Sequence, residues 1–236
     1  MRPQAVVGLG SFVFALLSPP DLMMVQQGVR PWQTEFAVDK STLASSGRNR
    51  FFLLEPGHQA VYEGGGERLT ITVLQKTEVV DGVTTRVVEE RETRDGVLAE
   101  VSRNFFAIST RDSSVYYFGE DVDIYEKGKV VKHEGAWRSG VNGARFGLMM
   151  PGQPAKGARY HQEVAPKVAM DRAEIVSITD AVKVPAGSYT GCVRTEETTP
   201  LEPGTKEDKR YCPGVGLVED ADLKLVQAPG IPAKKP

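Results

Sequence analysis

Apolar and polar side chains alternate through the middle of this chain, and the alternation predicts β-strands. In residues 69–73, leucine, isoleucine and valine take every second position and threonine takes the positions between. A period of two is typical of a strand that buries one face and leaves the other face wetter. No segment of the sequence shows a sustained helical period over a dozen residues. Further segments rich in β-branched and aromatic residues lie at 83–87, 97–105, 115–118, 175–184 and 188–195.

Short turn signals separate the predicted strands. Glycine follows aspartate at Asp81-Gly82 and at Asp95-Gly96, and such pairs adopt the left-handed backbone that two-residue hairpin turns require. The chain is therefore predicted to be all-β, an antiparallel meander of roughly ten strands. Long twisted hairpins curl, so we expect a curved sheet or an incomplete barrel, with a two-sheet β-sandwich as the alternative.

The two ends of the chain differ from the middle. Arg2 precedes an apolar run over residues 5–17, which is the composition of an export signal. An exported protein is periplasmic or extracellular, and it keeps no membrane span once the signal is cleaved. The alternatives are an uncleaved anchor and a wrongly assigned start. The expected segments are a signal peptide or N-terminal apolar segment at 1–18, a tether at 19–48, a single β domain at 49–226 and a proline-rich tail at 227–236.

The charge balance argues against nucleic-acid binding. The chain has 236 residues, with 29 Lys and Arg against 31 Asp and Glu, which gives a formal net charge of -2. A nucleic-acid footprint needs a basic stripe, and the sequence has none. The expected partners are a small apolar or amphipathic molecule or a protein of the cell envelope.

Cys192 and Cys212 are the two cysteines of the chain, and each falls in a predicted strand beside the loop 199–204. A symmetric hairpin around this loop places the two sulfur atoms opposite each other. An exported protein with an even number of cysteines favours a disulfide, so we predict the pair Cys192–Cys212. The alternatives are a redox pair, which normally has closer spacing, and a metal site, which needs more ligands nearby.

Two regions interrupt the meander and supply candidate ligand-binding residues. The first is the acidic segment 120–126, and the second is the glycine-rich segment 135–152. The strand 115–118 before them is bulky on both faces, so we expect it to be central or to line a cavity. A long loop inside a compact domain is usually functional, so these side chains are candidates to wall a pocket. The alternatives are that the loop caps the open end of the sheet and that the acidic segment is a solvated strand end. The candidate ligand-binding residues are Tyr117, Phe118, Glu120, Trp137, Arg145, Phe146 and Met149.

Metal binding is a further hypothesis, and no other cofactor is indicated. His161 and Glu163 are two residues apart, so in a strand they share a face and can reach one metal ion. Either His58 or His133 is available to complete such a site. The alternative is that the three histidines are surface or strand-end residues. The sequence contains neither a nucleophile elbow nor a glycine-rich phosphate loop that opens a helix.

Three short motifs carry a resemblance to known proteins. The segments 56–62 (PGHQAVY), 115–120 (VYYFGE) and 211–218 (YCPGVGLV) resemble exported bacterial all-β proteins of unassigned function. The resemblance covers roughly residues 55–220, and the closing motif is similar to the last hairpin of envelope proteins with a lipocalin-like or lipoprotein-carrier-like curved sheet. It implies a fold and a compartment. It implies neither chemistry nor the disulfide.

Three functional hypotheses remain. The first is a non-catalytic exported protein that binds a small apolar or amphipathic ligand in the concave face of the sheet. The second is a metal-assisted hydrolase or oxidoreductase that uses His161 and Glu163. The third is a structural or partner-binding envelope protein without a pocket. Convergence of the histidines favours the second hypothesis, and a filled concavity favours the third.

Overall fold

β-Strands dominate the structure, a computed structural model that describes residues 30–229. The predicted export segment, the first part of the predicted tether and the end of the proline-rich tail lie outside the described residues. None of the described residues forms a helix long and apolar enough to cross a membrane. The elements are η1 (Lys40–Thr42), β1 (Leu43–Ala44), β2 (Gly47–Arg48), β3 (Leu53–Leu54), β4 (Gln59–Gly64), β5 (Glu67–Val80), β6 (Val83–Arg94), β7 (Val97–Ser109), β8 (Val115–Glu126), β9 (Lys129–Lys132), β10 (Trp137–Arg138), β11 (Arg145–Met150), β12 (Arg159–His161), β13 (Glu163–Val164), β14 (Arg172–Val184), β15 (Gly187–Thr198), β16 (Glu207–Cys212), β17 (Gly216–Asp220) and β18 (Leu223–Gln227).

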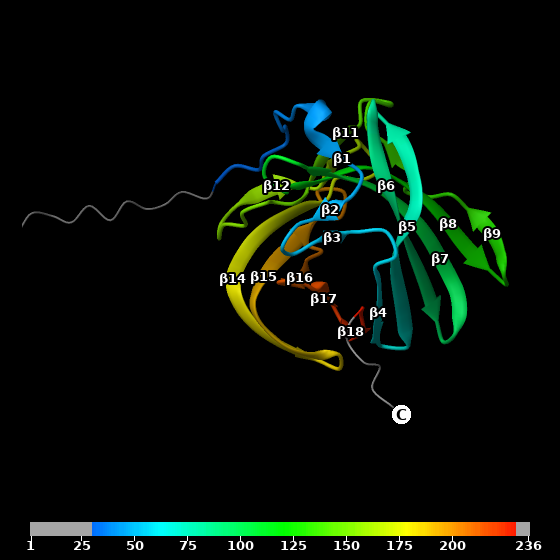
Figure 1. Cartoon of the computed structure of the whole chain (residues 1–236). Helices are drawn as coiled ribbons and strands as arrows, with labels where there is room; N and C mark the ends of the chain where they lie inside the picture. The colour runs from blue at the N-terminus through cyan, green and yellow to red at the C-terminus, as the bar shows by residue number, and fades with distance from the viewer. Residues whose placement is uncertain (1–29, 230–236) are drawn as a thin grey trace, which may run out of the picture.

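One antiparallel sheet contains sixteen of the strands formed by residues 30–229. The long strands β5 to β8 form one wall, and the curved hairpin β14–β15 forms the wall that faces it (Figure 1). Strands β16, β17, β18 and β4 join the two walls in that order. The all-β antiparallel prediction is confirmed. At the turn between β5 and β6, Asp81 and Gly82 have φ angles of 49° and 76°, the left-handed backbone expected of this hairpin.

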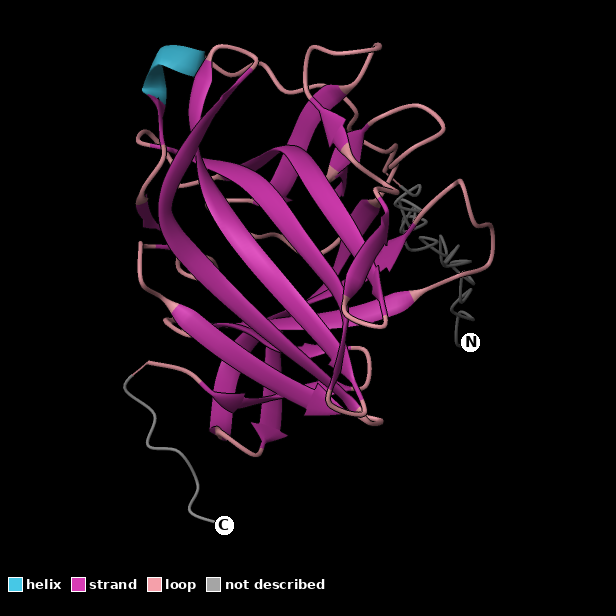
Figure 2. Ribbon diagram, turned by 90° about the vertical axis from the view of Figure 1, so that its right-hand side faces the viewer, coloured by secondary structure: helices cyan, strands magenta, loops and turns pink. Residues whose placement is uncertain are grey.

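The sheet curls until it nearly closes into a barrel (Figure 2). Strand β12 pairs with β14, while β13 pairs with β11, which in turn pairs with β8. Only Gln162 separates β12 from β13, so residues 159–164 bridge the two ends of the sheet. A side chain at Gly147 on β11 would collide with the backbone of Gln162. Glycine at this position therefore permits the close crossing, and the prediction of an incomplete barrel is confirmed.

The segment 135–152, which the sequence suggested was a loop, contains β10 and β11. Both strands pair with β8, at Trp137↔Glu120 and at Gly147↔Tyr117. Its glycines obscure the strand pattern in the sequence, because glycine is depleted in ordinary strands. The segment therefore forms part of the barrel wall.

The described part of the predicted tether packs on the barrel. β1 pairs with β7, with Leu43 opposite Ser109, and the Phe36 ring meets Tyr116 edge-on with centroids 6.1 Å apart. Asp39 caps η1 by accepting a hydrogen bond from the Ser41 backbone N–H. Residues 36–44 are therefore held against β7 and β8, whereas Gln33 bridges to Tyr160 of β12.

The disulfide Cys192–Cys212 is present and links β15 to β16. Both cysteines are fully buried in a small apolar cluster that includes Val182, Val218 and Leu225. The prediction of a disulfide is confirmed, and the bond ties the curved wall to the strands that join the two walls.

Removing this disulfide is expected to lower the free energy of unfolding by about 3 kcal/mol, because the bond restricts an unfolded loop spanning about 20 residues. Urea unfolding of the oxidised protein and of the double variant Cys192→Ala/Cys212→Ala measures the difference. Reducing agent should shift the midpoint of the parent protein and leave that of the variant unchanged. Equal midpoints for the parent and the variant would show that the bond adds no stability.

Candidate ligand-binding cavity

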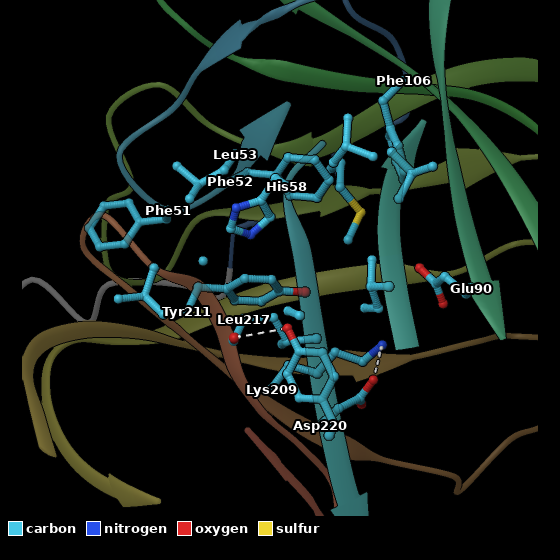
Figure 3. A pocket seen from close by; sticks show the side chains of 18 residues that line it. Phe51, Phe52, Leu53, His58, Glu90, Phe106, Lys209, Tyr211, Leu217 and Asp220 are labelled. Atoms are coloured by element: carbon cyan, nitrogen blue, oxygen red, sulfur yellow. Dashed lines mark hydrogen bonds and ion pairs between the residues drawn. The ribbon is translucent and has the colours of Figure 1, made fainter. Parts of the chain in front are cut away.

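A cavity lies between the two walls of the barrel (Figure 3). The cavity volume is about 100 Å³ in the part that Figure 3 shows and about 190 Å³ in the part that adjoins it. Ligand pockets for small molecules typically span about 300–1,000 Å³. The two parts together approach the lower end of this range, so the concave face of the sheet is hollow and has room for a small ligand.

Apolar side chains line one half of the cavity, which we call the apolar half. They come from strands that neighbour one another in the sheet, because Ala60 of β4 pairs with Ile71 of β5, and Val73 pairs with Val88 of β6. Residues between β2 and β4 cover this half, and Figure 3 shows Phe52 and His58 over the cavity. The apolar half is lined by Phe51, Phe52, Leu53, His58, Ala60, Tyr62, Ile71, Val73, Val88, Tyr211, Val215, Gly216 and Leu217.

Polar and acidic side chains line the other half, which we call the acidic half. Glu90, Phe106, Met149 and Lys209 line both halves, so the two halves form one continuous space. The remaining side chains of the acidic half come mainly from β7, β8, the bridging residues 162–163 and β15. They are Asn104, Tyr117, Glu120, Trp137, Gln162, Glu163, Ala169, Asp171 and Glu197.

A bulge in β8 brings Tyr117 and Glu120 to the same side of the sheet. Tyr117 pairs with Phe106 and Glu120 pairs with Asn104, and the register shifts between these two pairs. Because one extra residue is inserted, positions three apart face the same way instead of opposite ways. The Tyr117 hydroxyl donates to Asn104 Oδ1 at 2.5 Å, which fixes the phenol inside the cavity.

Carboxylates outnumber cations in the cavity. Lys209 is the one lysine or arginine among the described residues that line the two halves. Its Nζ lies 3.4 Å from Glu197 Oε2 and 3.4 Å from Asp220 Oδ2, and Figure 3 draws the pair with Asp220. The six carboxylates that line the cavity are Glu90, Glu120, Glu163, Asp171, Glu197 and Asp220.

Burial raises the pKa values of the carboxyl groups in the cavity. Burial is the main cause for Glu90, and the nearby Asp220 and Glu100 add to it against the opposing effect of Lys209, so that the pKa of Glu90 rises to about 7. For Glu120, burial and the negative charges of Glu90 and Glu100 raise the pKa to about 8. Near neutral pH each of these two groups is therefore protonated in part of the molecules.

Burial and neighbouring charges also shift the pKa values of the other charged groups in the cavity. Burial and the neighbouring Asp171 raise the pKa of Glu163 well above its usual range, and burial also raises the pKa of Glu197. Burial alone would lower the pKa of Lys209, but the charges of Glu197 and Asp220 outweigh it and raise that pKa well above its usual value. Lys209 is consequently a permanent cation in the cavity.

Four of the seven predicted ligand-binding residues line the cavity: Tyr117, Glu120, Trp137 and Met149. Trp137 is 6% exposed, and its ring meets that of Tyr117 edge-on with centroids 5.2 Å apart. Gln162 Nε2 approaches the Met149 sulfur at 3.6 Å. These side chains meet in the acidic half, although they come from three different strands.

The other three predicted residues do not line the cavity. The Phe118 and Phe146 rings stack on each other, with centroids 4.8 Å apart. Lys40 lies over the Phe146 ring at 5.9 Å from its centroid, so this aromatic pair packs beneath the N-terminal segment. Arg145 is exposed at the start of β11. Phe118 and Phe146 therefore contribute to the packing of the barrel, and Arg145 lies on its surface.

The candidate metal ligands lie in different surroundings. His161 meets the Trp32 ring edge-on with centroids 6.3 Å apart, whereas Glu163 lines the acidic half of the cavity. His133 pairs with Asp123 at 2.8 Å, and His58 lies in the apolar half. Within residues 30–229, no three side chains of His, Cys, Asp or Glu gather closely enough to hold a metal ion.

Sequence reasoning missed Glu90, Glu197, Lys209 and Asp220. Glu90 is two residues after Val88, and Lys209 is two residues before Tyr211, so each shares a strand face with a buried apolar residue. A charged residue in register with a buried face is a signal of an interior charge. Their convergence depends on pairings between distant parts of the chain, which the sequence alone does not reveal.

Comparison with known proteins adds little to this description. No protein-family model matches the chain, and no curated protein matches it. The chain is similar to a solved structure of the hypothetical protein CT021 from Chlamydia trachomatis, with 10% sequence identity and a TM-score of 0.21, over 77% of this chain and 93% of that one. A TM-score this low does not show a shared fold, so the function of this chain has to be inferred from its own cavity.

Proposed function

We propose that this chain is an exported, non-catalytic binding protein that holds a small apolar or amphipathic ligand in the concave face of its sheet. The continuous cavity between the two walls carries the proposal. The apolar half, covered by Phe51, Phe52 and Leu53, offers a ligand more buried apolar contact than an open surface does.

Two further observations support the proposal. A buried disulfide is stable in an oxidising compartment such as the periplasm or the extracellular space, and the apolar run at residues 5–17 has the composition of an export signal. The hollow interior disfavours a purely structural protein, because such a protein would gain stability from a filled core.

Binding of a neutral fluorescent probe, N-phenyl-1-naphthylamine, tests the proposed function. We expect saturable fluorescence enhancement at one site, because the apolar half removes the probe from water. The variant Ala60→Phe should lose this binding, since Ala60 is 3% exposed and lines the apolar half. A phenyl group at this position would occupy part of the cavity.

Ala181→Phe is the matched control, because Ala181 is exposed on β14 and the same substitution there leaves the cavity unchanged. Circular dichroism and the unfolding midpoint show whether each variant keeps the fold. Equal probe affinity in a folded Ala60→Phe variant would contradict binding in the cavity, and so would the absence of saturable binding by the parent protein.

A further inference from the structure

Four carboxylates of the acidic half have no cationic partner among the described residues: Glu90, Glu120, Glu163 and Asp171. Neither Glu120 nor Glu163 forms an ion pair, whereas Glu197 and Asp220 share Lys209. Glu163 is only 3% exposed. One of its oxygens accepts the Asp171 backbone N–H at 2.5 Å, and no described residue donates to the other oxygen. A buried carboxylate without a full set of partners is costly, and a ligand that supplies a cation removes that cost.

Aromatic rings lie beside these carboxylates. Trp137 and Tyr117 line the same half of the cavity and pack edge-on against each other. The faces of such rings attract alkylammonium groups. Carboxylates together with aromatic rings form the surroundings that an organic cation prefers, and the adjoining apolar half suits a hydrocarbon tail.

We propose that the cavity binds an amphipathic organic amine, with its ammonium head between Glu120, Glu163 and the Trp137 ring and its tail in the apolar half. This inference rests on the proposed function and adds the chemical class of the ligand. An ammonium head donates up to three hydrogen bonds and brings the charge that the acidic half lacks. A carboxylate ligand would instead add a like charge, which disfavours binding.

The protonation of the acidic half is coupled to binding of such a head group. The raised pKa values of Glu90 and Glu120, about 7 and about 8, mean that the cation displaces protons when it binds near neutral pH. Affinity for an ammonium ligand should therefore increase as the pH rises from 6 to 8.5. Glu90 and Glu120 are faced by the charged or titratable groups of Glu100, Tyr117, Glu163, Asp171, Glu197, Lys209 and Asp220.

Calorimetric titration with three ligands of equal tail length tests the inference. Octylamine is protonated at pH 8, octanol is neutral and octanoate is an anion, and all three are used below their micellar concentrations. We expect octylamine to bind the full chain at least about tenfold more tightly than octanol, and octanoate to bind more weakly than octanol. Spermidine, a cation without an apolar tail, should bind more weakly than octylamine.

The outcomes separate the two proposals. If octanol or octanoate binds as tightly as octylamine, the preference for a cation is overturned and the binding function stands. If spermidine matches octylamine, the role of the apolar tail is overturned. If none of the four compounds binds and the neutral fluorescent probe does not bind either, both proposals fail together.

A variant that removes the charge of Glu120 tests where the ammonium head binds. Glu120→Gln should weaken octylamine binding about tenfold and leave octanol binding unchanged, because only the cation uses the carboxylate charge. Glu126→Gln on the same strand is the control, since Glu126 is exposed at the end of β8. Equal octylamine affinity in Glu120→Gln and Glu126→Gln would overturn the assignment of Glu120.

Discussion

Replacing Lys209 by methionine is expected to lower the free energy of unfolding by about 3–5 kcal/mol at pH 8, because removal of one partner leaves buried charges without compensation. The Lys209 ammonium lies 3.4 Å from both Glu197 and Asp220. Methionine keeps most of the aliphatic length of the side chain, so the lost charge accounts for most of the effect. Urea unfolding of parent and variant measures it.

The same substitution predicts a pH dependence that a packing defect would not produce. Without the ammonium, the neighbouring carboxyl groups can regain neutrality only by binding protons. The stability difference between Lys209→Met and the parent should therefore shrink as the pH falls from 8 to 5. Lys183→Met is the matched control, because Lys183 is exposed on β14. A difference that stays constant with pH would contradict the electrostatic explanation.

The protein without ligand is expected to become less stable as the pH rises from 5 to 8.5. For Glu90, the usual pKa of 4.5 applies to the unfolded chain and a pKa of about 7 to the folded protein. Below both values each state binds the proton, and between them the folded state binds more, so stability falls as the pH rises. A shift of this size corresponds to a loss of about 3 kcal/mol, and Glu120 adds to it in the same direction.

Carboxyl groups on the surface do not change this pH dependence of the unfolding free energy. Hydrogen bonds and nearby cations lower the pKa values of Asp39 and Asp123 below the usual 3.8, so these groups titrate below the window of interest. The measurement is the unfolding free energy in urea at several pH values. Glu120→Gln should flatten the slope, and Glu126→Gln should keep it. An unfolding free energy that rises steadily from pH 5 to 8.5 would contradict the presence of buried carboxyl groups with raised pKa values.

Much of the fold follows from local patterns. Hairpin turns such as Asp81-Gly82 need only two residues with left-handed backbone, and the alternation of side chains identifies the long strands that such turns join. Cys192 and Cys212 could be paired because the hairpin around residues 199–204 is local. Features that depend on neighbours in the sequence were therefore predictable.

The cavity depends on features that the sequence conceals. The bulge in β8 places Glu120 on the same side as Tyr117, whereas strict alternation separates them. Phe118 and Phe146 were expected in the pocket, but the N-terminal segment supplies a second apolar surface that packs against their side of β8. A long-range contact of this kind has no signal in the local pattern. The aromatic content of a segment therefore does not show which of its side chains line the cavity and which pack against the N-terminal segment.

A crystal structure of the full chain grown with octylamine would show whether the cavity is a binding site. We expect the amine nitrogen within hydrogen-bond distance of Glu120 or Glu163 and the tail between Phe52 and Leu217 in the apolar half. Octylamine found only on the outer surface, with side chains filling the space between the two walls, would contradict the account.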